Sequence, residues 1–282
     1  MDFHLSTAEL FVPDGLAPEA ALARTTHLAV SAHQDDLEIM AFDGILAGFG
    51  REDKWFTGVV VTNGAGSARD NLYKDYTDAE MMVVRRKEQK KAAVVGEFAA
   101  VAMLDYPSSA IKDAQDRRAV EDIAALLRAA RPEVVYTHNF ADKHDTHVGV
   151  ALKTLAAIRS LPKEERPSKV YGCEVWRDLD WMTDTDKVAF DVSAHESLQA
   201  ALLGVFDSQI VGGKRYDLAT MGRRKAHATY HASHGTDATT GLNFGMDLTP
   251  LAQDETLSIQ TFALGFLDRF RQEVEQRLAK LS

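Results

Sequence analysis

Short apolar runs alternate with longer amphipathic segments along most of the chain. The runs have the length of buried strands, and the segments between them repeat apolar residues at helical spacing. We predict strands at 26–32, 56–62, 100–105, 133–137, 170–175 and 187–191. The clearest predicted helices are 79–98, 117–130, 147–161, 194–206, 216–230 and 262–281. This alternation predicts an α/β fold: a Rossmann-like, mainly parallel sheet covered by helices on both faces.

The segments outside this alternation are few. Residues 1–25 are expected to form an N-terminal arm. Residues 236–258 contain Gly241, Gly245 and Pro250 among polar residues and are expected to form a long loop over the cleft or at a contact. The helix at 262–281 then ends the chain. No linker or internal repeat stands out, so 1–282 is predicted to be a single domain, long enough to bury a large core.

Composition and charge narrow the classes of function. A formal net charge of −10 argues against general nucleic-acid binding, because phosphate contacts require a basic surface. The single cysteine, Cys173, forbids an intrachain disulfide. No apolar run approaches the roughly 20 residues of a membrane span, and the first 25 residues lack the pattern of a secretory signal. We therefore expect a cytoplasmic protein.

The first predicted strand runs directly into a cluster of polar residues that can bind a metal. His33, Asp35, Asp36 and Glu38 follow it within a few residues. In open α/β sheets the loops at the carboxyl ends of strands hold the chemistry. Several carboxylates close together cost electrostatic energy unless a cation or a proton neutralises them, and imidazole and carboxylate are both zinc ligands. A divalent metal at this strand end would remove that cost.

A second cluster of the same kind follows the strand at 133–137. It includes Asp142, His144 and His147, and His147 is placed in the first turn of the helix at 147–161. Two clusters at strand ends can converge at one edge of the sheet. They would then provide three protein ligands and an open position for water, which is typical of a catalytic rather than a structural zinc site.

Both clusters resemble motifs of the LmbE/PIG-L-like de-N-acetylases, a family that removes acetyl groups from N-acetylglucosamine-type substrates using zinc. The segment 32–38 matches the family's alanine-histidine-proline-aspartate-aspartate-x-glutamate motif except for Gln34, which replaces a proline that is not a ligand. The segment 142–147 resembles the aspartate-x-histidine-proline-aspartate-histidine motif, with Asp142, His144 and His147 in place. Weaker matches at 60–64 and 85–88 extend the resemblance over roughly 26–235.

The resemblance implies a division of roles. His33, Asp36 and His147 would bind the zinc, and Asp35 would be the general base on the attacking water and then the acid toward the leaving amine. His144 is the expected donor to the oxyanion. Some family members have a tyrosine where Asp142 stands here, and Asp142 is expected instead to orient His144 by accepting its other ring proton. The same ligand set also accepts iron, cobalt, nickel or manganese.

Further residues are candidates for substrate contact, each with a structural alternative. The resemblance favours Arg85, although a charged helical face is often only solvated. Glu38 contacts a substrate hydroxyl, supports the site or caps a helix. Trp176 belongs to a loop that stacks on a sugar or packs on the surface. His231 and His234 share a helical stripe with His227, and this stripe either frames the cleft or packs against the body.

The sequence therefore predicts a zinc-dependent deacetylase whose partner is an N-acetylated amino sugar or conjugate. A hydrolase of another acylated amine and a metal- or sugar-binding protein without catalysis are the alternatives, and homo-oligomerisation is left open. A dinucleotide site is disfavoured. The glycines at 64 and 66 follow the second strand, whereas the first strand leads into carboxylates that would repel phosphate.

Overall fold

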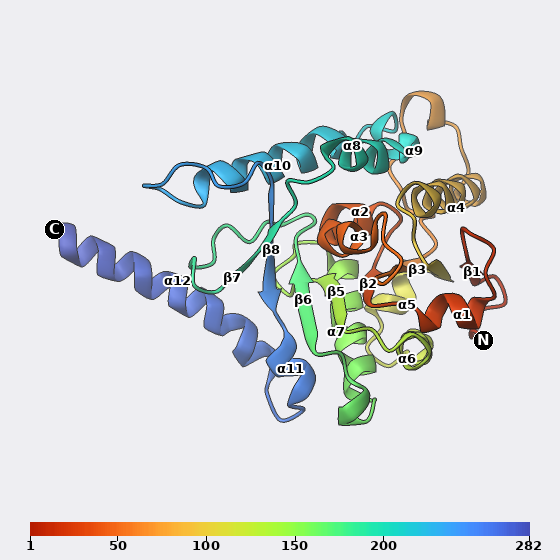
Figure 1. The fold of residues 1–282 in the computed structure, drawn as a ribbon, viewed down its shortest axis with the longest axis horizontal. Coiled ribbons are helices and arrows are strands. Elements are labelled where there is room, and N and C mark those ends of the chain that lie inside the picture. The colour runs from red at the N-terminus through yellow and green to blue at the C-terminus, as the bar shows by residue number, and fades with distance from the viewer.

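A single eight-stranded sheet runs through the centre of the computed structural model, which describes all 282 residues (Figure 1). Its strands lie in the order β1-β4-β3-β2-β5-β6-β8-β7. The strands are β1 (Glu9–Phe11), β2 (His27–Ser31), β3 (Phe56–Thr62), β4 (Ala100–Tyr106), β5 (Val134–His138), β6 (Lys169–Cys173), β7 (Lys187–Asp191) and β8 (Leu242–Asp247).

The five strands from β4 to β6 in this order are parallel, as the alternation of strands and helices predicts. β1 adds to one edge antiparallel to β4, and β8 lies antiparallel between β6 and β7. The predicted fold class, a mainly parallel α/β sheet, is confirmed.

Helices cover both faces of the sheet (Figure 1). One face packs against α1, α5, α6, α7 and α11, and the other against α2, α3, α4 and α8, with α10 lying against α8 and β8. The helices are α1 (Pro18–Ala23), α2 (Asp36–Met40), α3 (Phe42–Gly48), α4 (Asp78–Val95), α5 (Ser108–Lys112), α6 (Arg118–Ala130), α7 (Asp145–Arg159), α8 (Glu196–Gly204), α9 (Asp207–Ile210), α10 (Tyr216–Tyr230), α11 (Thr249–Gln253) and α12 (Ile259–Leu281). Two short 3₁₀ turns, Asn71–Tyr73 and Lys163–Glu165, complete the elements.

Alternation of side chains along the strands divides the core into two halves. Leu28 and Val30 of β2 face the half that packs against α6 and α7, and Ala29 between them faces the half that packs against α3 and α8. These three consecutive residues are apolar and lie in one half of the core or the other. The centre of the strand is therefore a continuous apolar run, as expected for a sheet buried on both faces.

Two predicted irregular segments contain regular structure. The expected loop at 236–258 holds β8 and α11, and the expected arm at 1–25 holds β1 and α1. Leu242, Phe244 and Met246 alternate with other residues along β8 and are buried, which is the period-two pattern of a strand. Gly245 conceals this pattern in the sequence, because glycine is typical of a loop. In the structure, its missing side chain leaves room for the ring of Phe190 on β7.

The far half of α12 extends away from the rest of the molecule (Figure 1). Phe266 is its only buried residue, and most residues after it are exposed. No helix of the structure is both long and apolar enough to cross a membrane.

Chain order creates a switch point beside β2. The chain passes from β2 to β3 and β4 on one side, and then crosses to β5 on the other side. Loops that leave neighbouring strands in opposite directions open a crevice at their carboxyl ends, where α/β proteins bind ligands. The two polar clusters follow β2 and β5, so both lie at this crevice.

Candidate metal centre and active site

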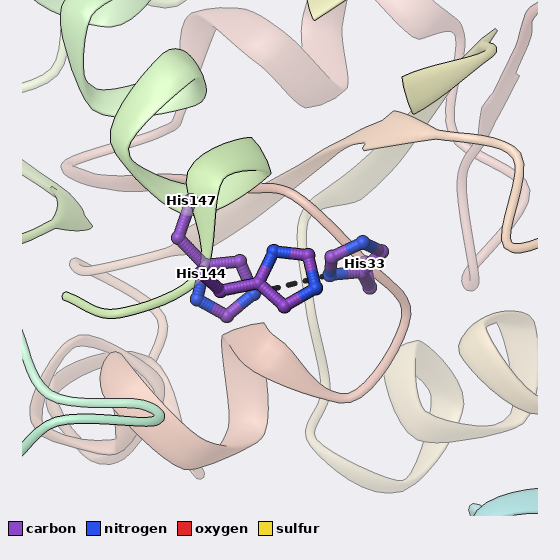
Figure 2. A group of neighbouring side chains, drawn as sticks. All are labelled: His33, His144 and His147. Carbon is purple, nitrogen blue, oxygen red and sulfur yellow. Dashed lines mark hydrogen bonds between the residues drawn. The ribbon is translucent and has the colours of Figure 1, made fainter. Parts of the chain in front are cut away.

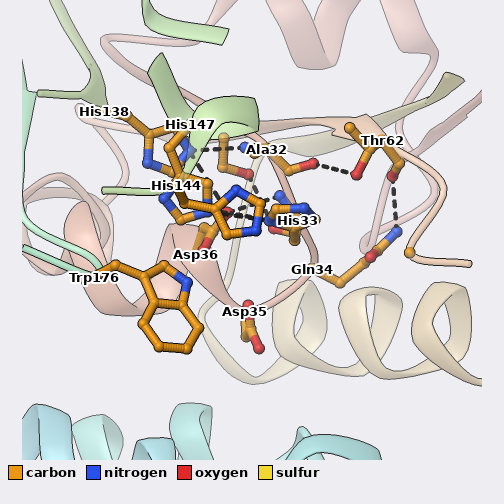
Figure 3. Close-up of polar contacts among 12 residues, drawn as sticks. Ala32, His33, Gln34, Asp35, Asp36, Thr62, His138, His144, His147 and Trp176 are labelled. Carbon is orange, nitrogen blue, oxygen red and sulfur yellow. Dashed lines mark hydrogen bonds and ion pairs between the residues drawn. The ribbon is translucent and has the colours of Figure 1, made fainter. Parts of the chain in front are cut away.

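The two clusters predicted from the sequence meet in space. His33 follows β2, Asp36 is the first residue of α2, and His147 lies in the first turn of α7. The rings of His33, His144 and His147 lie beside one another (Figure 2), and Asp36 lies against the same group (Figure 3).

Three donor atoms form a nearly equilateral triangle. Nδ1 of His33 lies 3.1 Å from Nε2 of His147, and Oδ2 of Asp36 lies 3.3 Å from the first and 3.4 Å from the second. Donors at about 2.0–2.1 Å around a tetrahedral zinc ion are separated by roughly 3.3 Å. The geometry and the chemistry of this donor set therefore fit a zinc-sized cation.

The electrostatics of the triangle also favour a cation. Burial opposes ionisation of Asp36, but His147 and the neighbouring histidines outweigh it and hold the pKa of this carboxyl well below its usual range. Burial likewise disfavours a charged His147, yet the carboxylates of Asp36 and Asp142 raise the pKa of this imidazole. Positive charge is thus stabilised at the point where the three donors converge.

His138 also approaches Asp36, but its lone pair is already used. The backbone N–H of Ala32 donates to Nε2 of His138 at 2.9 Å, and the buried imidazole stacks on His147 with ring centroids 4.0 Å apart. Nε2 is therefore an acceptor for the strand end, and burial keeps the pKa of His138 well below its usual value. His138 supports the loop after β2 rather than offering a free ligand atom.

Asp142 connects three parts of the site. Its Oδ1 accepts from the backbone N–H of His144 at 2.9 Å, and its Oδ2 accepts from the backbone N–H of Trp176 at 3.1 Å. The same Oδ2 lies 3.4 Å from Nδ1 of His147. A carboxylate there favours a proton on Nδ1 and leaves Nε2 of His147 free for the donor triangle. The imidazole that Asp142 faces is therefore that of His147 and not, as expected, that of His144, whose backbone alone it contacts.

Asp35 lies apart from the triangle, with its carboxylate turned away from Asp36 (Figure 3). Its backbone has a φ of 97°, a strained conformation that directs successive carboxylates to different places. Burial raises the pKa of Asp35, an effect that the guanidinium of Arg85, 3.4 Å from Oδ2, opposes. A carboxyl with a raised pKa beside the donor triangle suits proton transfer.

Burial and the neighbouring histidines lower the pKa of His144 to about 4. At neutral pH the imidazole is therefore uncharged and carries one N–H. Its Nδ1 has no hydrogen-bond partner in the protein. His144 lines the cavity described below, so the ring is available to a substrate.

Glu38 does not face the cavity. It is 1 % exposed and accepts from Nε2 of Gln89 at 2.9 Å, while Oε1 of Gln89 lies 3.4 Å from the backbone N–H of Asp35. Arg224 of α10 donates to the carbonyl groups of Glu38 and Ile39. These bonds fix the end of α2, so Glu38 belongs to the support of the site and not to its substrate-facing surface.

Gln34, which replaces the proline of the family motif, serves as a second support. Its side-chain Nε2 donates to the backbone carbonyl of Thr62, at the end of β3, at 3.1 Å. The backbone carbonyl of Gln34 accepts from Nη2 of Arg85. Gly64 packs beside it, with a φ of +74°, and a Cβ there would lie 2.5 Å from Oε1 of Gln34. The exchange therefore keeps the loop in place and adds no ligand.

A cavity of about 460 Å³ opens beside these groups. The predicted site residues on its wall are His33, Asp35, Asp36, Arg85, His144 and Trp176. Sequence reasoning missed Lys112, Lys214, Tyr216 and the polar residues Ser67, Ser108, Thr146 and Gln209, which also line it. These come from loops and helix ends that no local pattern marks as part of a site.

His231 and His234 do not line the cavity, so their placement gives no support to a role in substrate contact. His231 ends α10 near the ring of Phe244, and His234 is exposed beyond it. Of the predicted stripe, only His227 is buried against the body: its ring stacks on Phe244 of β8, and its Nε2 lies 3.0 Å from Oε1 of the buried Glu174. The helix ends at Tyr230, so the stripe does not extend to His234.

Solved structures of similar fold include enzymes of more than one reaction. GalB, the 4-carboxy-2-hydroxymuconate hydratase of Pseudomonas putida KT2440, matches with a TM-score of 0.62 and 18% identity over 79% of this chain and 95% of its own. The N,N'-diacetylchitobiose deacetylase of Pyrococcus horikoshii matches with a TM-score of 0.59 and 15% identity over 79% and 84%. The A40926 pseudoaglycone deacetylase Dbv21 matches with a TM-score of 0.57 and 16% identity over 79% of this chain and 97% of its own. At these identities the likeness shows the fold.

A comparison with curated protein sequences finds no match. Residues 28–158 match the family model described as PIG-L: GlcNAc-PI de-N-acetylase. This segment spans both clusters that meet at the crevice, from β2 into α7. Over these residues, just under half of the chain, the protein is similar to the PIG-L family, and the solved structures share its fold.

Proposed function

We propose that the protein is a metal-dependent hydrolase that removes the acetyl group from an N-acetylglucosamine-type sugar or conjugate. The observation that carries the proposal is the triangle of His33, Asp36 and His147 with a separate buried carboxylate, Asp35, beside it. Three protein donors leave a zinc ion with an open position, as in catalytic sites. The family match and the deacetylases among the similar structures support the reaction class.

Zn²⁺ held by His33, Asp36 and His147 would supply a Lewis acid that polarises the amide carbonyl and acidifies water. The same donors would accept Fe²⁺, Co²⁺, Ni²⁺ or Mn²⁺. Asp35 takes a proton from the attacking water, because it is a carboxylate on the cavity wall that the triangle does not use. The protonated Asp35 then returns that proton to the leaving amine, so one group serves as base and acid.

Other residues on the cavity wall would orient the substrate. His144, uncharged and exposed to the cavity, donates its N–H to the oxygen that becomes negative during attack. Arg85 restrains Asp35 and faces the cavity with donors of its own. Trp176, whose ring lies 6.4 Å from that of His144, offers an aromatic face on which a pyranose ring can stack.

The test is acetate release from N-acetylglucosamine, N,N'-diacetylchitobiose and N-acetylglucosamine conjugates, measured with the purified protein. The same preparation is assayed after chelation and again after one equivalent of zinc is restored. We expect acetate release that is lost on chelation and regained with metal. This readout separates amide hydrolysis from water addition of the kind named for GalB.

Stoichiometric metal without acetate release from any N-acetylated sugar would overturn the proposed reaction. Acetate release that survives complete metal removal would overturn the proposed role of the triangle.

A further inference from the structure

The cavity beside the donor triangle carries more positive than negative side chains. The charged residues that line it are Arg85, Lys112 and Lys214, which are positive, and Asp35 and Asp36, which are negative when ionised. Both carboxylates are buried in the reaction centre, Asp36 among histidines and Asp35 against Arg85. The whole protein carries a net charge of −10, so the excess of positive side chains on this cavity wall is a local feature that favours an anionic ligand.

The two lysines have no acidic partner. Both are exposed, and neither ammonium lies within ion-pair distance of a carboxylate, unlike those of Lys187 and Lys225. Exposed lysines without an acidic partner occur elsewhere on this chain, but these two border the cavity at the proposed reaction centre. Their ammonium groups are therefore free to bind an anion there.

Lys214 is held in place at the cavity. Its backbone N–H donates to the carbonyl of Gln209 at 2.9 Å, and its carbonyl accepts from the N–H of Tyr216 at 2.7 Å. Its Nζ lies 5.0 Å from the ring centroid of Trp176, which is within the range of a cation–π contact. The ammonium is therefore positioned over an aromatic residue that lines the same cavity.

Lys112 approaches from a different element. It is the last residue of α5, which follows β4, whereas Lys214 lies between α9 and α10. Arg85, 1 % exposed on the same cavity, has no hydrogen-bond partner for Nε or Nη1, although Nη1 lies 3.9 Å from Oε2 of Glu88. A buried guanidinium with free donors costs free energy until an acceptor reaches it. Three cationic groups from three elements thus border one space.

We propose that the substrate carries a phosphate or carboxylate group, away from its acetamido group, that binds at Lys112 and Lys214. This inference rests on the proposed function for the reacting end of the substrate. A neutral acetylated sugar would leave both ammoniums unpaired, whereas an anionic one gains charge-assisted hydrogen bonds.

The test compares three substrates that share the acetamido sugar: N-acetylglucosamine, its 6-phosphate, and N-acetylmuramic acid, which carries a carboxylate. We expect the wild type to prefer one of the anionic sugars, and the better one identifies the anion. Lys112→Gln and Lys214→Gln should each lower kcat/KM for that sugar roughly ten- to hundredfold, mainly through KM. Activity on the neutral sugar should stay within about twofold. Lys225→Gln, an exposed lysine elsewhere on the surface, is the matched control.

Equal losses on neutral and anionic sugars, or a wild-type preference for the neutral sugar, would overturn the inference. Binding of inorganic phosphate, measured by calorimetry, keeps the test independent of turnover. The wild type should bind phosphate at least tenfold more tightly than the Lys112→Gln/Lys214→Gln double variant, and equal affinities would overturn the inference. Absence of acetate release from all three sugars would instead count against the proposed function.

Discussion

Replacement of Asp142 by asparagine tests how the site holds its metal ligand. The side chain of Asp142 is fully buried, and its carboxylate serves three groups: the backbone N–H of His144, the backbone N–H of Trp176 and Nδ1 of His147. Asparagine has nearly the same shape but offers one oxygen and one amide NH₂ group. In either orientation of the amide, its NH₂ group would face at least one of these three N–H donors. In the wild type, each of them lies 2.9–3.4 Å from a carboxylate oxygen.

The expected loss follows from these contacts. Removing a carboxylate that orients a ligating histidine costs about ten- to hundredfold in metal affinity. This corresponds to about 1.4–2.8 kcal/mol of binding free energy. The metal-free protein should also lose about 1–3 kcal/mol of unfolding free energy, because one buried N–H is left without an acceptor.

The assay is competition for Zn²⁺ against a chelator of known affinity, with urea unfolding of the metal-free protein in parallel. Asp145→Asn is the control, because it removes the same charge from an exposed residue in the first turn of α7. We expect the control to change metal affinity by less than about threefold. Equal affinities of Asp142→Asn and wild type would refute the argument that Asp142 orients His147.

Three further predictions concern stability, each measured by urea unfolding. Arg224→Met should lower the unfolding free energy by about 2–4 kcal/mol, because the carbonyl of Glu38 and the buried side-chain oxygens of Asn243 and Gln199 lose a donor; the exposed Lys225→Gln should change it by less than about 0.5 kcal/mol, and similar values for both would contradict this role. Gly64→Ala should destabilise by at least ~1 kcal/mol more than Gly50→Ala, since both have positive φ but only the first meets a side chain within 4 Å; equal costs would show that only backbone strain matters. Removal of residues 271–282 should cost less than about 1 kcal/mol, because their ion pairs stay within α12; a larger loss would reveal contacts that this fold does not contain.

The parallel core and the two polar clusters were predictable because their signals are local. A buried strand in an α/β sheet is apolar throughout, and the residues that follow it are chemically distinctive, as His33 and Asp36 are after β2. β8 was missed because Gly245 within it and Pro250 after it are typical of a loop. Its position between β6 and β7 depends on contacts with residues far along the chain.

The supports and walls of the site could not be predicted from local pattern. Arg224 reaches α2 from nearly 190 residues away in the chain, at separations of 186 and 185 positions. Lys112 ends α5 and Lys214 lies in the loop before α10, so their approach to the cavity depends on how these helices pack. His231 and His234 were predicted to share a helical stripe with His227, but α10 ends at Tyr230, and the spacing of the histidines does not mark that end.

The most direct test of the account is the metal-to-protein ratio of Asp35→Asn and Asp36→Ala, determined together with acetate release from the same preparations. Asp35→Asn should retain one metal per chain while turnover falls roughly 10²–10⁴-fold, because only proton transfer is removed. Asp36→Ala should lose both metal and activity, because it removes a corner of the donor triangle. Equal metal loss in both variants, or full activity in Asp35→Asn, would contradict the division of the two adjacent carboxylates into a base and a ligand.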